Sequence, residues 1–235
     1  MTLPLNRLDE FNSFEDTARF NMIEQQIRPW LVDDPQVLEL LATLKRENFI
    51  LPAFRSLAFA DIEIPLLGEQ DAEIYPDRCM LPPKIEARFL NDLKIQSHEK
   101  ILEIGTGSGY MAALLAALGQ EVLSLEIHGK LVDFAKKNLE HNQIHNVKVL
   151  QKDASRDLPD GQFDVIVISG AVTQVPAALL ERLQDGGRLI AVVGESPVMR
   201  VTMVRKENGV LHATTPWDYC SALLQGFPRH SEFQF

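Results

Sequence analysis

Cysteine is scarce in this sequence, and no apolar run is long enough to cross a bilayer. Cys79 and Cys220 are the two cysteines among 235 residues, and they show no metal-ligand spacing, so neither a disulfide framework nor a zinc site is indicated. No apolar stretch approaches the ~18 residues of a membrane span. Residues 1–20 carry acids and lack the basic start and apolar core of a signal peptide. We therefore expect a cytoplasmic protein with no membrane partner and no bound metal.

Basic residues are also outnumbered. The chain has 23 Lys and Arg against 33 Asp and Glu, a net charge of −10 and a pI near 5.1. Such a balance argues against nonspecific binding to nucleic acid, whose phosphates require a basic surface. Apolar residues at 46% and charged residues at 24% are typical of a globular protein. The length suits one well-buried α/β domain with an appendage.

From residue 100 onward, strand and helix patterns alternate. Residues 164–168 (DVIVI) are almost entirely apolar, as expected where helices cover both faces of a parallel sheet. Asn208 and Gly209, between residues 200–206 and 210–215, indicate a hairpin. The predicted strands are 100–104, 121–126, 147–152, 163–169 and 187–193, and the predicted helices are 110–118, 129–142 and 175–184, with Gly186 and Gly187 separating the last helix from the last strand. The pattern predicts an α/β fold, namely a doubly wound, mostly parallel sheet with an antiparallel C-terminal edge hairpin.

The first part of the chain reads as a helical extension. Helices are predicted at 14–27, 35–44 and 84–93, and Asp34 followed by Pro35 is a typical helix start. Residues 68–83 form a loop rich in acids and proline with no clean period. We divide the chain into residues 1–83, the helical region with this loop, and residues 84–235, the cofactor-binding domain. The loop is expected either to cover the reactive end of the cofactor or to be a surface excursion.

A glycine turn follows the first predicted strand. Gly105, Gly107 and Gly109 alternate in the segment 100–110 (KILEIGTGSGY), which lets the backbone turn tightly and approach a ligand. Dinucleotide-binding folds use G-x-G-x-x-G, in which the helix N-terminus receives a pyrophosphate. The third glycine here comes one residue earlier, as in the loop of S-adenosylmethionine methyltransferases. We therefore predict S-adenosyl-L-methionine as the cofactor and disfavour an oxidoreductase.

Two acids at strand ends extend this site. Glu126 ends the second strand, about 20 residues past the first glycine, where a carboxylate accepts hydrogen bonds from ribose hydroxyls. Asp153 ends the third strand, where an acid accepts from the adenine amino group and the next N–H, of Ala154, reaches a ring nitrogen. A local alternative exists for Asp153, because aspartate also favours the cap before residues 155–158.

The sequence resembles the protein-L-isoaspartate O-methyltransferase family, from about residue 21 to residue 194. The resembling segments are 21–29 (NMIEQQIRP), 34–38 (DPQVL), 102–110 (LEIGTGSGY), 163–167 (FDVIV), 175–180 (VPAALL) and 185–190 (DGGRLI). The resemblance implies a class I methyltransferase fold of Rossmann-like type and carboxyl methylation of isoaspartyl residues in damaged proteins. The glycine turn, the two acids and this resemblance together predict the following cofactor contacts: Glu103, Gly105, Thr106, Gly107, Ser108, Gly109, Tyr110, Glu126, Ile127, Asp153 and Ala154.

The substrate half departs from the family pattern. The family's Thr-Ile-Ser-Gln-Pro loop aligns with residues 79–83 (CMLPP), so Leu81 or Met80 replaces the serine that helps hold the substrate carboxylate. Neither side chain donates such a hydrogen bond. Residues 67–77 carry acids, residues 221–224 (SALL) replace a Phe-Val-Pro-Leu strand, and Ala154 replaces a glycine. These differences predict that isoaspartyl activity is weak or absent.

Three functions stay open at this point. The first is isoaspartyl methylation of a protein or peptide, the second is methylation of another acceptor, including a small molecule, and the third is a cofactor-binding module without turnover. A carboxylate nucleophile needs desolvation and alignment but no general base. The six histidines (His98, His128, His141, His145, His212 and His230) fall mostly at predicted helix ends or loops and read as surface residues. Arg28 either faces an anionic substrate or forms an ion pair that closes its helix onto the core domain.

Overall fold

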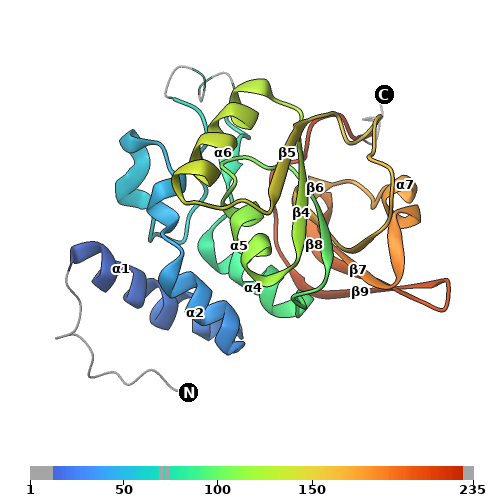
Figure 1. The fold of residues 1–235 in the computed structure, drawn as a ribbon, viewed down its shortest axis with the longest axis horizontal. Helices are drawn as coiled ribbons and strands as arrows, with labels where there is room; N and C mark the ends of the chain where they lie inside the picture. The colour runs from blue at the N-terminus through green and yellow to red at the C-terminus, as the bar shows by residue number, and fades with distance from the viewer. Residues whose placement is uncertain (1–12, 69–70, 72, 74, 230–235) are drawn as a thin grey trace.

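A seven-stranded sheet forms the frame of the molecule (Figure 1). The computed structural model describes residues 13–68, 71, 73 and 75–229. The strands of the sheet are β3 (Lys100–Ile104), β4 (Glu121–Glu126), β5 (Val147–Gln151), β6 (Phe163–Val172), β7 (Leu183–Glu195), β8 (Val198–Glu207) and β9 (Val210–Asp218). Their spatial order is β5-β4-β3-β6-β7-β8-β9.

The pairing confirms the predicted mixed sheet. Strands β3 to β7 are parallel, and β8 and β9 add two antiparallel strands at one edge. Asn208 and Gly209, with φ of 53° and 77°, form the tight turn between β8 and β9, as a primed hairpin turn requires. The chain leaves β3 for β4 and β5 on one side and returns to β6 on the other. This switch point gathers the loops at the carboxyl ends of β3, β4 and β6, where ligands bind in such folds.

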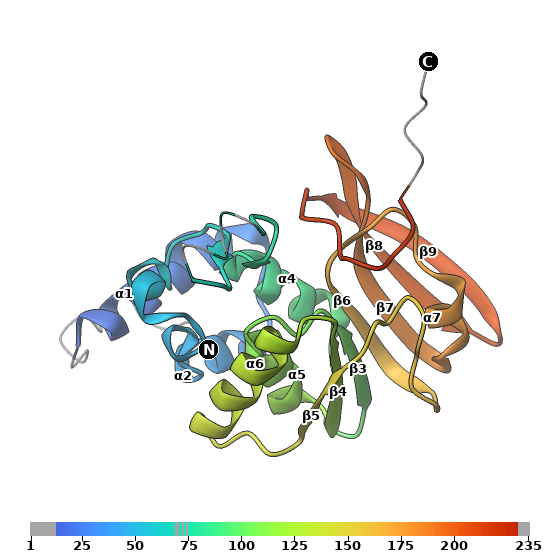
Figure 2. The same cartoon turned by 90° about the horizontal axis from the view of Figure 1, so that it is seen from above.

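The helices cover the two faces unequally. Figure 2 shows α4 (Pro83–Leu93), α5 (Tyr110–Leu118) and α6 (Gly129–His141) on one face and the short α7 (Ala177–Glu181) on the other. Helix α5 packs closely because seven of its nine residues are buried. Residues 152–162, between β5 and β6, hold turns and no helix. The far face of the sheet is therefore less covered than the doubly wound pattern suggests.

Three predictions on the C-terminal side differ from the structure. The helix expected at 175–184 is limited to α7, because Leu183 already pairs with Phe163 as the start of β7. Gly186 and Gly187 do not separate a helix from a strand. They lie inside β7, between Leu183 and Arg188, where the register against β6 shifts. The strand expected at 163–169 continues to residue 172.

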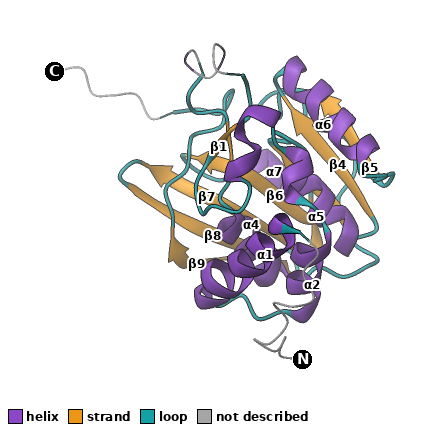
Figure 3. Cartoon of the chain, turned by 90° about the vertical axis from the view of Figure 1, so that its left-hand side faces the viewer, coloured by secondary structure: helices purple, strands orange, loops and turns teal. Residues whose placement is uncertain are grey.

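The N-terminal elements stand in front of the sheet on the α4–α6 side (Figure 3). The helix predicted at 14–27 is α1 (Phe14–Met22) followed by a π-helical turn at Ile23–Ile27. The other elements of this region are α2 (Pro35–Thr43), the 3-10 turns Arg28–Trp30, Arg46–Phe49 and Pro52–Leu57, and the two-stranded ladder of β1 (Ile64–Pro65) and β2 (Cys79–Met80). Their buried apolar residues join those of α4, α5 and α6 in one core. The division at residue 83 stays a prediction.

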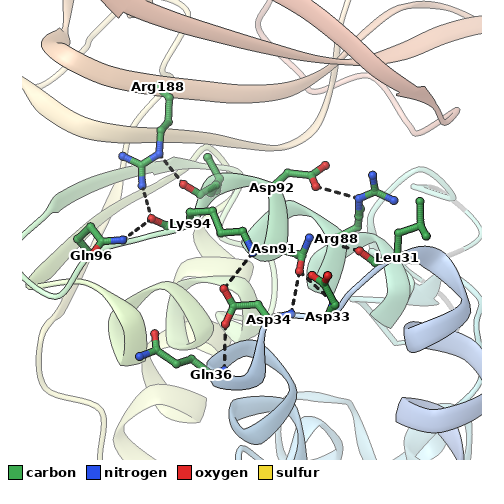
Figure 4. Close-up of polar contacts among 11 residues, drawn as sticks. Leu31, Asp33, Asp34, Gln36, Arg88, Asn91, Asp92, Lys94, Gln96 and Arg188 are labelled. Atoms are coloured by element: carbon green, nitrogen blue, oxygen red, sulfur yellow. Dashed lines mark hydrogen bonds and ion pairs between the residues drawn. The ribbon is translucent and has the colours of Figure 1, made fainter. Parts of the chain in front are cut away.

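Hydrogen bonds connect α4 to the N-terminal region and to strand β7 of the sheet (Figure 4). The side chain of Asn91 accepts from the N–H groups of Asp33 and Asp34 at 3.1 Å each. At the same end of α4, Arg188 of β7 donates to the carbonyls of Leu93 and Lys94 at 2.6 and 3.1 Å. A guanidinium at a helix C-terminus satisfies carbonyls that have no partner inside the helix. The C-terminal end of α4 is therefore held both to the N-terminal region and to the sheet. No helix in the described part of the chain is long and apolar enough to cross a membrane.

Candidate cofactor and acceptor site

The glycine turn connects β3 to α5 at the switch point. Gly107 has a φ of +54°, and a Cβ there would lie 3.1 Å from Cδ1 of Leu66. Gly109 has a φ of +84°, and a Cβ there would meet Ala135 of α6 at 3.3 Å. A side chain is therefore disfavoured at both positions by backbone conformation and by space. The turn needs its glycines to approach Leu66 on one side and α6 on the other.

Glu126, at the end of β4, is bonded to this turn. Its carboxylate accepts from the N–H of Gly107 and from the N–H of His128, at 3.0 Å each. The residue is 6% exposed. Burial raises the pKa of Glu126, whereas the two backbone donors lower it. Each carboxylate oxygen has a second lone pair beyond the bond shown, so the group can hold the turn and still accept from a ligand hydroxyl.

Glu103 is buried behind the turn. Its carboxylate accepts from the hydroxyls of Ser124 at 2.6 Å and Ser169 at 2.9 Å. The Ser124 hydroxyl lies 2.5 Å from that of Thr106, so the network links β3, β4, β6 and the glycine turn. Burial raises the pKa of Glu103 to about 8, although the two serine donors act in the opposite direction. Burial therefore favours the protonated form of this group, which is a fixed part of the framework behind the turn.

A cavity opens in front of the glycine turn and Glu126. The described residues that line it are Glu63, Leu66, Asp77, Arg78, Cys79, Met80, Leu81, Glu86, Gly105, Thr106, Gly107, Ser108, Met111, Glu126, Ile127, Leu131, Ser169, Gly170, Ser221, Ala222, Leu223, Leu224, Gln225 and Arg229. They come from the glycine turn, the ends of β4 and β6, the first turns of α4, α5 and α6, the β1–β2 region, the segment 221–225 and Arg229. The site thus combines the sheet with two segments that are far apart in sequence.

The segment 221–225 closes the cavity on the β6 side. The N–H of Ala171 donates to the carbonyl of Ala222 at 2.9 Å, and the N–H of Leu224 donates to the carbonyl of Ala171 at 2.8 Å. The side chain of Leu224 lies close to two glycines, since a Cβ at Gly105 would be 3.3 Å and one at Gly170 2.6 Å from its Cδ2. Small residues at these two places therefore allow the leucine to cover the end of the sheet.

The wall where a serine was expected is apolar. Met80 and Leu81 are 5% and 6% exposed and both line the cavity. The carbonyl of Leu81 accepts from Nη2 of Arg46 at 2.7 Å, and Arg46 is fully buried and ion-paired with Glu86. Burial raises the pKa of Glu86 to about 7, and Arg46 lowers it. The strand β2 and the buried ion pair fix the apolar wall in place.

The remaining charge on the cavity is mostly negative. Four carboxylates line it, from Glu63, Asp77, Glu86 and Glu126, against the two basic residues Arg78 and Arg229. Cys79 also lies on this wall. Burial raises the pKa of its thiol to about 11, with Glu63 and Asp77 adding to the effect. Cys79 is therefore a neutral thiol at pH 7 and not an activated nucleophile.

The predicted cofactor contacts divide into two groups. Gly105, Thr106, Gly107, Ser108, Glu126 and Ile127 line the cavity, whereas Glu103, Gly109, Tyr110, Asp153 and Ala154 do not. Tyr110 faces the N-terminal core, where its ring lies 5.3 Å from that of Phe49 and under the guanidinium of Arg46. The first group remains a direct candidate for ligand contact, and Glu103 and Gly109 shape the turn from behind.

Asp153 caps a turn, because the helix at 155–158 that was its local alternative does not form. Its Oδ1 accepts from the backbone N–H of Ser155 at 3.0 Å and from the Ser155 hydroxyl at 2.6 Å. The N–H groups of Arg156 and Asp157 donate to the Asp153 carbonyl, which forms a turn at this place and no helix. The adenine contact predicted for Asp153 and Ala154 stays a prediction.

Arg28 forms an ion pair within its own helical segment, and this is not the pair that was expected to close the segment onto the core domain. Its Nε lies 2.8 Å from Oε1 of Glu24, and neither residue lines the cavity. Trp30 packs edge-on against Trp217. The five histidines within the described residues also lie away from the cavity wall, and His230 falls outside the described residues. Within those same residues, no group of three or more His, Cys, Asp or Glu side chains is arranged to hold a metal.

The loop predicted at 68–83 is described in part. Residues 69, 70, 72 and 74 lie outside the described residues. The remainder contributes Asp77 to Leu81 to the cavity wall, so this end of the loop does face the glycine turn. Control of access by the loop stays a prediction.

Several cavity residues have no clear signal in the sequence. Ser169 ends the strand predicted at 163–169 and Gly170 follows it, so the general rule for strand ends would have found both, although β6 itself continues to Val172. Leu66, Arg78 and Leu224 come from segments without a recognisable motif. They reach the glycine turn only through the β1–β2 ladder and the contact of segment 221–225 with Ala171.

Comparisons with known proteins agree with this arrangement. The family profile described as Protein-L-isoaspartate(D-aspartate) O-methyltransferase matches residues 17–218. The protein-L-isoaspartate O-methyltransferase of Koribacter versatilis is 37% identical over 198 residues, covering 83% of this chain and 85% of the relative. That of Methanospirillum hungatei is 34% identical over 197 residues, covering 83% and 88%. A Plasmodium falciparum structure, titled as a putative protein-L-isoaspartate O-methyltransferase in complex with S-adenosyl-L-homocysteine, shares the fold with a TM-score of 0.73, at 21% identity over 90% of this chain and 98% of that one.

Proposed function

The chain belongs to the protein-L-isoaspartate(D-aspartate) O-methyltransferase family, and on that basis we propose that it methylates isoaspartyl carboxylates in damaged proteins or peptides with S-adenosyl-L-methionine. One observation of the structure carries the proposal above all. Glu126 faces the cavity while bonded to the N–H of Gly107, so the ribose-binding acid and the glycine turn form a single surface. That surface suits an adenosine ligand.

The chain's own residues fit this cofactor. The backbone of Gly105 to Ser108 lies along the cavity without a side chain at the two glycines, which leaves room for the amino-acid half of the ligand. Glu126 would accept from the ribose hydroxyls, and Ile127 would pack beside the adenosine. Asp153 and Ala154 remain the proposed contacts of the adenine edge.

The walls suit methyl transfer to a carboxylate. When bound, S-adenosylmethionine supplies a methyl group that its sulfonium charge already activates. Leu66, Met80, Leu81 and Leu224 surround the space with apolar atoms and exclude water from it. A carboxylate that loses its hydration shell becomes a better nucleophile, and alignment then supplies most of the remaining rate. No proton must be removed from such an acceptor.

A second acceptor class is favoured by the wall at residues 80–86. Leu81 offers no hydroxyl to a carboxylate, and four acids on the cavity repel one. An acceptor that must lose a proton would need a general base. Glu86 meets that need best, because it lines the cavity and because burial raises its pKa to about 7. The alternative function is therefore methylation of an amine, hydroxyl or thiol acceptor.

Methyl transfer to matched peptides tests the proposal. Two peptides of the same sequence, one isoaspartyl and one normal aspartyl, are incubated with the protein and methyl-labelled cofactor. We expect label on the isoaspartyl peptide alone, in a form released as methanol at alkaline pH, because carboxyl methyl esters hydrolyse there. Cofactor binding without labelling of either peptide would overturn the isoaspartyl assignment. Base-stable label on another acceptor would favour the alternative.

A further inference from the structure

Arg78 is a basic residue on the cavity wall that the proposed chemistry leaves unused. It directly precedes β2, and its backbone is held on both sides. Its carbonyl accepts from the N–H of Leu66 at 2.9 Å, and its N–H donates to the carbonyl of Tyr75 at 3.1 Å. The side chain therefore starts from a fixed point beside the cavity.

The guanidinium of Arg78 is held by two contacts. It stacks on the ring of Tyr75, with its central carbon 3.8 Å from the ring centroid. Its Nη2 donates to Oε1 of Gln225 at 3.0 Å. The other terminal nitrogen, Nη1, is buried and has no hydrogen-bond partner within the described residues. A buried, charged donor without a partner is costly, so an acceptor that reached Nη1 would remove this cost.

The residues around Arg78 lie near Glu126, the acid proposed to bind the ribose. Arg78 is one of the charges that lower the pKa of His128, after burial, and its charge also opposes the burial that raises the pKa of Glu126. Tyr75 in turn contacts the His128 ring edge-on, with centroids 6.1 Å apart. The residue after Gln225 is Gly226, where a Cβ would lie 2.5 Å from Oδ1 of Asp153. Arg78 therefore lies between the ends of β4 and β5 and the C-terminal segment.

We propose that Arg78 binds the adenosine half of the cofactor, with Nη1 donating to a ribose or purine acceptor and the guanidinium packing on the purine face opposite Tyr75. The inference rests on the proposed function. Adenosine offers ring nitrogens, ribose oxygens and a π face, all of which suit a planar cation. The carboxylate of the amino-acid half is the other acceptor on such a ligand. Arg78 stacks on Tyr75, which in turn contacts His128 beside the end of β4, and this position favours adenosine.

Calorimetry with two ligands tests this assignment. S-adenosylhomocysteine contains both halves, whereas 5′-methylthioadenosine contains the adenosine and the thioether without the amino acid. We expect Arg78→Met to raise the Kd for both ligands by the same factor, about tenfold to a hundredfold, as for the loss of a charged hydrogen bond. Arg78→Lys, which keeps the charge and loses the planar group, should fall between. Arg200→Met is the matched control, because Arg200 is an exposed residue of β8 that is paired with Asp218. It should leave the Kd of both ligands unchanged.

A second variant tests whether any loss of binding in Arg78→Met comes from a folding defect. Tyr75 is 38% exposed, so Tyr75→Leu should leave thermal unfolding unchanged while it releases the guanidinium and weakens both ligands several-fold. Unchanged constants in Arg78→Met and Tyr75→Leu would overturn the inference. So would a loss confined to S-adenosylhomocysteine, because Arg78 would then bind the carboxylate. A wild-type protein that binds neither ligand would contradict the proposed function itself, and the inference with it.

Discussion

Replacing Glu126 with alanine separates ligand recognition from the support of the glycine turn. In the structure the carboxylate already accepts two backbone N–H groups, from Gly107 and His128. With cofactor bound it would also accept from ribose hydroxyls. Hydrogen bonds to a charged acceptor contribute about 1.5–3 kcal/mol. We therefore expect Glu126→Ala to weaken S-adenosylhomocysteine binding by that amount, which is roughly a 10- to 150-fold rise in Kd.

The same substitution has a separate effect on stability. Gly107 and His128 are half-buried, so water can replace the lost acceptor in part, and removal of a buried carboxylate offsets some of the loss. We expect the free energy of unfolding to fall by about 1–2 kcal/mol. Glu121→Ala is the matched control, because Glu121 lies on the same strand, is exposed and pairs with Lys100 on the surface at 3.0 Å. An exposed pair of this kind contributes at most about 1 kcal/mol.

Two measurements keep these effects apart. Calorimetric titration with S-adenosylhomocysteine gives the Kd without turnover, and urea denaturation gives the free energy of unfolding. The reasoning is refuted if Glu126→Ala lowers stability while the Kd stays at the wild-type value. In that case Glu126 supports the turn and does not read the ribose.

Three further predictions concern the turn, the buried acid and the acceptor wall. Gly107→Val should abolish cofactor binding in calorimetry, because a β-branched residue is disfavoured at a φ of +54° and would also press on Leu66. Circular dichroism should still show a folded protein, and retained binding would show that the turn is only structural. Burial raises the pKa of Glu103 to about 8, so this group contributes stability that is fully present below about pH 4.5 and is lost as pH rises through 8, on the order of a few kcal/mol. Urea denaturation from pH 5 to 8 should therefore show that the free energy of unfolding depends less on pH in Glu103→Gln than in the wild type, and identical slopes would contradict the assignment. Leu81→Ser should lower the KM for an isoaspartyl peptide by restoring a hydroxyl donor on the wall, and an unchanged or higher KM would show that this position does not face the substrate carboxylate.

The elements around the cofactor site were predictable because their signals are local. Residues 100–104, 110–118 and 121–126 were assigned with the bounds of β3, α5 and β4. Apolar runs of strand length, broken by glycines, leave few other interpretations. The hairpin at Asn208 and Gly209 was predictable for the same reason.

The errors and omissions arise from long-range pairing. Gly186 and Gly187 are typical helix-ending residues, yet the pairing of Leu183 with Phe163 places them in a strand bulge. The extension of β6 to residue 172 goes with the contact between Ala171 and segment 221–225. No local pattern indicates that contact. The cavity wall formed by segment 221–225 could not be predicted, since its residues meet the sheet only in the folded chain.

The central claim is that the glycine turn and Glu126 form a binding site for S-adenosylmethionine and its demethylated product. Calorimetric titration of the wild-type protein with S-adenosylhomocysteine, and separately with NADH, tests it most directly. The account predicts one-to-one binding of S-adenosylhomocysteine and no heat of binding for NADH. Binding of NADH in preference to S-adenosylhomocysteine would contradict it.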